Sequence, residues 1–132
     1  MIMKHSVENG DKSRNGNKLE NYFTEQTGLK KITKKQKPTF NNSHGKKQII
    51  DFDFHKNVND VDIYMDLTTT YRSDRLKQKA YNALMYKNNF DKPCKFYMVI
   101  GSLIEHGKKK KPVLIEGIDG VITIEEAIIM VK

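Results

Sequence analysis

Two neighbouring stretches of the chain alternate strictly between apolar and polar residues. In residues 48–55 the apolar residues of one face are Ile50, Phe52 and Phe54. In residues 61–68 they are Val61, Ile63, Met65 and Leu67. A period of two residues is typical of β-strands with one buried face, and a short Asn-containing link joins the two stretches. The pattern therefore predicts an antiparallel β-hairpin over residues 48–68, with its turn at residues 56–59.

Apolar residues at helical spacing predict three helices around this hairpin. The first is expected over residues 18–27 with Gly28 as its C-cap, and the second over residues 74–88, begun by Ser73 or Asp74. The third is expected over residues 123–131, where Thr123 and Glu126 match a capping box. Two further strands are expected, an apolar one over residues 96–104 and a short one over residues 113–116. These elements predict an α/β (α+β) fold with a mixed central sheet flanked by helices.

The chain has the length of one domain, 132 residues. Residues 1–17 are rich in Asn, Gly, Ser and Lys, which predicts a flexible segment ahead of a single domain over residues 18–132. One cysteine, Cys94, excludes an intrachain disulfide and a Cys-based zinc site. No apolar run reaches the ~20 residues that span a bilayer, and Met1–His5 lacks the apolar core of a signal peptide. We therefore expect a cytoplasmic protein without a membrane partner.

Charge is distributed unevenly along the chain. The net charge is +8, yet residues 51–68 carry five Asp and a single Lys. A basic protein suits a polyanionic partner such as DNA, although solubility alone also explains the excess of Lys. The acidic stretch favours the first interpretation, because an acidic site within a basic protein is what metal-dependent chemistry on a nucleic acid requires.

The polar positions of the hairpin bring carboxylates together. Asp51 and Asp53 alternate with the apolar residues of the first strand, and Asp66 does so in the second. A turn centred between Val58 and Asn59 places Asp66 opposite Asp51, and directly opposed side chains lie ~5 Å apart at Cβ. Like charges at that distance need a neutralising partner, and oxygen ligands suit Mg²⁺, with Mn²⁺ as an alternative. A solvated outer face is the other interpretation of the same pattern.

The order of these elements resembles the core of the restriction-endonuclease-like PD-(D/E)XK nucleases. The similarity covers about residues 15–104 and rests on a helix with an acidic residue, a hairpin with Asp and Asp-x-Thr, a basic helix and an apolar strand. It implies that Asp51 or Asp53, together with Asp66, binds the metal ion and activates water. It also implies that Glu20 reaches the metal ion from the first helix. Glu20 as an ordinary surface residue is the alternative.

The sequence departs from this family at Thr68, which stands where the family has Lys. A threonine lacks the positive charge that offsets charge developing on the phosphate. Either Lys77 or Lys79, on the next helix, supplies it, or the site is weakened or inactive.

Basic residues next to the acidic strand suit phosphate binding. Arg72 and Arg75 follow Asp66 closely, and a guanidinium binds phosphate bidentately. Ion pairs with Asp62 or Asp74 are the alternative for both. Lys46 and Lys47, in the lysine-rich segment before the hairpin, are further candidates for binding nucleic acid.

The resulting hypothesis is a Mg²⁺-dependent DNA endonuclease of restriction type, acting as a homodimer because cutting two strands symmetrically needs two sites. A Holliday-junction-resolvase-like nuclease is an alternative of the same class. A non-catalytic nucleic-acid-binding or regulatory protein that kept the fold is a second, favoured by Thr68. An acidic DNA mimic is a third, and the net charge of +8 opposes it.

Overall fold

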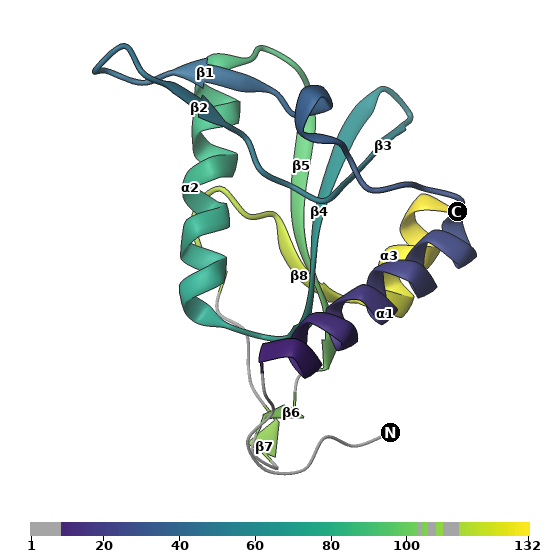
Figure 1. Ribbon diagram of the computed structural model, residues 1–132. Coiled ribbons are helices and arrows are strands. Elements are labelled where there is room, and N and C mark those ends of the chain that lie inside the picture. The colour runs from purple at the N-terminus through teal and green to yellow at the C-terminus, as the bar shows by residue number, and fades with distance from the viewer. Residues whose placement is uncertain (1–8, 103, 106–107, 110–113) are drawn as a thin grey trace.

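A computed structural model describes residues 9–102, 104–105, 108–109 and 114–132 (Figure 1). Its centre is a four-stranded sheet in the order β3-β4-β5-β8. The strands are β3 (Phe54–Val58), β4 (Val61–Thr70), β5 (Cys94–Ser102) and β8 (Gly120–Thr123). β3 is antiparallel to β4, whereas β4, β5 and β8 are parallel to one another. The sheet is therefore mixed, as the sequence predicts.

Helices cover both faces of this sheet. α2 (Ser73–Asn89) lies on one face, and α1 (Asn9–Thr27) and α3 (Ile124–Val131) lie on the other (Figure 1). The buried cluster on the α2 side includes Phe52, Tyr64 and Phe96. The cluster on the other side includes Phe23 and Met65. The prediction of one α+β domain with a mixed sheet flanked by helices is thus confirmed, and both faces of the central strands are buried.

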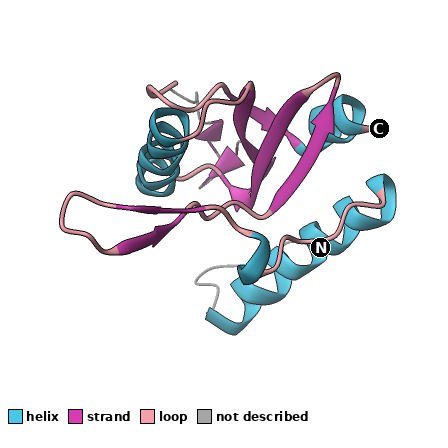
Figure 2. Ribbon diagram, turned by 90° about the horizontal axis from the view of Figure 1, so that it is seen from above, coloured by secondary structure: helices cyan, strands magenta, loops and turns pink. Residues whose placement is uncertain are grey.

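Two small two-stranded sheets lie outside the central one. β1 (Thr39–Asn41) and β2 (Lys47–Ile49) pair antiparallel and project away from the central sheet (Figure 2). β6 (Ile104–Glu105) and β7 (Lys108–Lys109) form the other. A single 3₁₀ turn, η1 (Lys34–Gln36), precedes β1. We call residues 39–49 the basic ribbon.

Some helix ends follow local sequence signals, but the N-cap of α2 is Arg72, without a side-chain hydrogen bond, and not the predicted Ser73 or Asp74. Gly28 caps α1 with a φ of 77°, and Thr123 and Glu126 form the predicted capping box of α3. α1 begins at Asn9, ahead of the predicted start, so residues 9–17 of the segment predicted to be flexible are helical. Residues 1–8 lie outside the described residues. Among the helices that the structure describes, none is long and apolar enough to cross a membrane.

The prediction of one continuous strand over residues 48–55 is wrong. The chain leaves β2 after Ile49, crosses residues 50–53 without regular structure, and enters the central sheet only at Phe54. The alternation is broken there, because Phe52 is buried on the α2 side and Phe54 on the opposite side. The apparent period of two in residues 48–55 therefore comes from two different environments and not from one strand.

The last predicted strand is also misplaced. Residues 114–116 are not a strand, and Val113 lies outside the described residues. Glu116 and Gly117 form a turn, in which Gly117 has a φ of 102° that an extended strand cannot continue. The strand that completes the sheet is β8, beginning at Gly120.

Candidate functional site

Asp53 and Asp66 lie opposite each other at one end of the β3–β4 hairpin. Phe54 pairs with Met65, so the same register extended by one residue places Asp53 opposite Asp66. The Asp53 amide donates to the Met65 carbonyl (3.0 Å), and the Leu67 amide donates to Asp53 Oδ2 (3.1 Å). The predicted pairing of Asp51 with Asp66 is therefore wrong.

The position of the turn explains the difference in register. Asn59 and Asp60 occupy it with φ values of 52° and 67°. Asn and Asp tolerate this left-handed region, which two-residue hairpin turns require. The turn is centred one residue later than expected, and this makes Asp53 the neighbour of Asp66.

The two carboxylates are buried together under α2. Asp66 is completely buried and Asp53 is 8% exposed. Burial raises the pKa of Asp53 to about 7, and the charge of Asp66 and a hydrogen bond between the two side chains act in the same direction. Two adjacent buried carboxylates are unfavourable when both are ionised, so the pair favours either a shared proton or a bound cation.

Two cationic side chains of α2 approach Asp66. Arg75 binds both of its oxygens, with Nε 2.8 Å from Oδ2 and Nη2 3.2 Å from Oδ1. Lys79 Nζ lies 3.4 Å from Oδ1. The two residues are one helical turn apart, which places them on the same face of α2. The side chain of Lys79 is only 11% exposed, whereas that of Arg75 is 36% exposed.

Asp51 lies on the other side of Lys79. Lys79 Nζ is 3.6 Å from Asp51 Oδ2 and also donates to the Asp51 backbone carbonyl. Lys37 pairs with the other carboxylate oxygen. Burial acts to raise the pKa of Asp51, but the hydrogen bond from Lys37 and the charge of Lys79 outweigh it and hold the pKa below its usual range. One ammonium thus joins Asp51 to Asp66.

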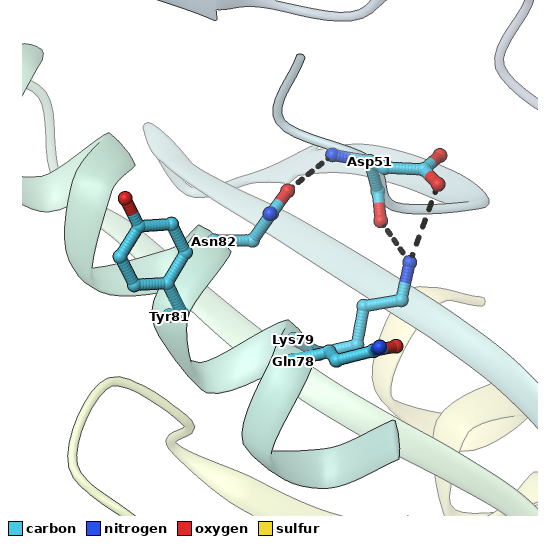
Figure 3. A pocket seen from close by; sticks show the side chains of 5 residues that line it. All are labelled: Asp51, Gln78, Lys79, Tyr81 and Asn82. Atoms are coloured by element: carbon cyan, nitrogen blue, oxygen red, sulfur yellow. Dashed lines mark hydrogen bonds and ion pairs between the residues drawn. The ribbon is translucent and has the colours of Figure 1, made fainter. Parts of the chain in front are cut away.

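A pocket of about 370 Å³ opens beside this ammonium (Figure 3). It is lined by Asp51, Gln78, Lys79, Tyr81 and Asn82. The Asn82 amide oxygen accepts the Asp51 backbone N–H at 2.5 Å, so α2 fixes the backbone as well as the side chain of Asp51. Figure 3 shows Lys79 reaching from the helix to Asp51, with the ring of Tyr81 on the other side of the pocket.

The other residues predicted for catalysis or metal binding have partners outside this cluster or are exposed. Glu20 pairs with Lys31 (3.1 Å). Burial acts to lower the pKa of Lys31, but its hydrogen bond to Glu20 and the charge of Asp53 raise it. Thr68 Oγ1 donates to the Thr70 carbonyl, and Lys77 is exposed. The sequence named Lys77 and Lys79 together, and the structure brings only Lys79 to Asp66.

The residues predicted to bind nucleic acid divide into three places. Arg75 belongs to the carboxylate cluster, while Arg72 pairs with Asp74 (2.7 Å) as an exposed ion pair, the alternative that its sequence context allowed. Lys46 and Lys47 are exposed on the basic ribbon.

Sequence reasoning missed two contributors to the site. Lys37 reaches it from the irregular segment before the basic ribbon, and no local pattern marks this residue. Asn82 carried a signal, because it follows Lys79 by one turn on the same flank of α2.

A comparison of the chain with protein-family models and with curated proteins finds no match.

Proposed function

We propose that this protein is a metal-dependent nuclease that cuts phosphodiester bonds in DNA. The observation that carries the proposal is the buried pair Asp53–Asp66 with the Lys79 ammonium 3.4 Å from Asp66. Two adjacent buried carboxylates cost stability, and such costs concentrate at functional sites. The resemblance to the restriction-endonuclease-like nucleases supports the same two carboxylates, and Lys79 then takes the part of the lysine missing at Thr68.

The donor set fits a hard divalent cation. Mg²⁺ and Mn²⁺ prefer oxygen ligands, and Mg²⁺ commonly takes one or two carboxylates together with waters and substrate phosphate. Among the described residues no group of three or more Asp, Glu, His or Cys side chains gathers around one point, so the protein's share would be Asp53 and Asp66. A bound divalent cation lowers the pKa of water and offsets phosphate charge.

The Lys79 ammonium is already positioned to stabilise the negative charge that develops on the phosphate during hydrolysis. In hydrolysis an oxygen of water forms a bond to phosphorus, the ester P–O bond breaks, and the leaving oxygen takes up a proton. Negative charge grows on the phosphoryl oxygens meanwhile, and a fixed ammonium stabilises it at little reorganisation cost. Contacts with Asp66 and with the backbone and side chain of Asp51 hold Lys79 in place for this role.

The basic ribbon supplies a surface for the DNA backbone. Residues 28–50, which include the ribbon, contain seven lysines and no acidic residue, and two of these lysines, Lys46 and Lys47, lie on the ribbon itself. The ribbon also starts and ends at the site, because Lys37 precedes β1 and pairs with Asp51, which follows β2. A two-stranded ribbon fits the major groove of duplex DNA. Phosphates bound along it lie next to the proposed cleavage position.

Replacing Lys46 and Lys47 by alanine together is expected to weaken DNA binding and to lower its salt dependence by up to about two in the slope of log K against log salt. The physical reason is the loss of two phosphate contacts with their released counterions. Fluorescence anisotropy over a salt series measures the slope. The control removes two exposed lysines near the start of β5, Lys92 and Lys95. An equal loss in the control would contradict a binding role specific to the ribbon.

The decisive experiment for the proposed function is a cleavage assay on plasmid, linear and branched DNA with Mg²⁺ or Mn²⁺. We expect cleavage that EDTA abolishes and that is absent in Asp66→Asn. Preference for branched DNA would favour the resolvase-like alternative over the restriction type. DNA binding without cleavage of any substrate would overturn the nuclease and favour a non-catalytic binding protein. A homodimer and a cytoplasmic location are part of the same proposal, and light scattering tests the first.

A further inference from the structure

The oxygens of Asp66 are already occupied by the protein's own cations. A carboxylate offers about four lone-pair positions. Arg75 donates to both oxygens, and Lys79 approaches Oδ1 as well. Asp66 is completely buried, and its remaining position is taken by the hydrogen bond with Asp53. A metal ion that replaces this proton would stand beside the cations of Arg75 and Lys79, and repulsion between like charges favours the departure of one of them.

Arg75 is the partner that is free to leave. Its side chain is 36% exposed, and its contacts in the described part of the structure are to Asp66 alone. Lys79 is 11% exposed and is held at Asp51 by two further contacts. Burial acts to lower the pKa of Arg75, and its hydrogen bonds to Asp66 and the charge of Asp66 raise it. A guanidinium stays protonated in proteins, so Arg75 remains charged when it leaves Asp66. It lies between a buried carboxylate and the solvent from which DNA arrives.

We propose that Arg75 exchanges Asp66 for a phosphate of the bound DNA, and that this exchange frees Asp66 to bind the metal ion. The inference rests on the proposed function. It is chemically direct, because the planar guanidinium binds carboxylate and phosphate in the same bidentate geometry. Without DNA, Arg75 neutralises Asp66 and keeps the metal site closed. When DNA is bound, the Arg75 guanidinium pairs with the phosphate instead, and the Asp66 carboxylate becomes available to the metal ion.

A coupling between two ligands follows from this exchange. DNA raises the affinity for the metal ion, and by thermodynamic linkage the metal ion raises the affinity for DNA by the same factor. Arg75 is a positioning residue in this scheme, because it acts on the metal ion through Asp66. A merely structural Arg75 would stabilise the fold without producing the coupling.

The test is a Mn²⁺ titration followed by electron paramagnetic resonance, with and without a short phosphorothioate DNA duplex that resists cleavage. For the wild type we expect the duplex to raise Mn²⁺ affinity roughly tenfold or more. Arg75→Ala is expected to bind Mn²⁺ tightly without the duplex, with a coupling factor near one. Arg75→Lys should restore part of the coupling. Arg72→Ala is the matched control, since it removes the same charge from the same helix start and should couple like the wild type.

Equal Mn²⁺ affinity of the wild type with and without duplex would overturn the exchange and leave the proposed metal site standing. Unchanged coupling in Arg75→Ala would do the same. No Mn²⁺ binding by any variant in either condition would overturn the proposed function together with the exchange. Circular dichroism checks the fold of each variant. If Arg75→Ala does not fold, Arg75→Gln, which keeps a donor toward Asp66 without the charge, is expected to show the same loss of coupling.

Discussion

The Lys79→Met variant is expected to lose about 10²–10³-fold in kcat for Mg²⁺-dependent DNA cleavage, the usual cost of removing one fixed group that stabilises transition-state charge. In the wild type the Lys79 ammonium lies 5.5 Å from the centre of the Phe52 ring. Methionine keeps an apolar side chain of similar length in this place but carries no charge. Asp66 remains paired with Arg75, and Asp51 with Lys37, so the carboxylates keep a cationic partner. Single-turnover cleavage measures the effect.

Lys77 provides the matched control for this experiment. It lies on the same helix and is exposed, so Lys77→Met removes the same charge without touching Asp66. Both variants should therefore weaken DNA binding in EDTA to the same small extent, and only Lys79→Met should slow cleavage. Equal loss of cleavage in the two variants, or full activity of Lys79→Met, would rule out a charge-stabilising role for Lys79.

The sequence prediction named both of these lysines, and the structure separates them by their positions around α2. The buried stripe of α2 contains Leu76, Ala80 and Ala83, and Lys79 lies on the same side of the helix. Lys77 lies about 100° around the helix from Leu76 and is exposed. Local signals of this kind predicted α2, β4, β5 and α3 close to their observed bounds, because each depends on neighbouring residues alone.

The identity of the paired carboxylate was not predictable in the same way. Asp51 and Asp53 are both candidates by alternation, and a shift of the turn by one residue changes which of them faces Asp66. The turn that sets this pairing is formed by Asn59 and Asp60, which adopt left-handed backbone conformations that most residues avoid. A chain containing Asn57, Asn59 and Asp60 offers several turn positions, and only the packing of the whole sheet selects one.

Burial of the site was unexpected for a related reason. The alternation at Asp62, Tyr64 and Asp66 suggested a polar face, but α2 covers it and Tyr64 belongs to the buried cluster beneath the helix. At the outer end of the same face, the side chain of Asp62 is partly exposed. Asp62 binds His55 (2.8 Å) and Asn57, which lower its pKa. The chemistry therefore depends on position along β4, with Asp62 near the solvent and Asp66 in the interior.

This difference leads to opposite effects of pH on stability. The pKa of Asp53 is raised in the folded protein, so between about pH 4 and pH 7 the folded state keeps a proton that the unfolded state has released. The free energy of unfolding therefore falls as the pH rises through this range and stays low above it. The pKa of Asp62 is lowered, so its contribution is present above its ordinary pKa and is lost as the pH falls.

Asp53→Asn is accordingly expected to make the folded protein more stable at about pH 8, by on the order of a few kcal/mol, while changing little near pH 4. The amide oxygen still accepts the Leu67 N–H, and its NH₂ group donates to Asp66 as a protonated Asp53 does. The same change removes a proposed metal ligand, so Mg²⁺-dependent cleavage should be lost. Urea unfolding at several pH values in EDTA measures the stability.

Asp62→Asn is the control with the opposite sign and should be less stable than the wild type at about pH 8. Greater stability combined with lost cleavage would show that the carboxylate pair is kept for chemistry at the expense of the fold. A less stable Asp53→Asn at about pH 8 would mean instead that the ionised pair, with Arg75 and Lys79, contributes net stability to the fold.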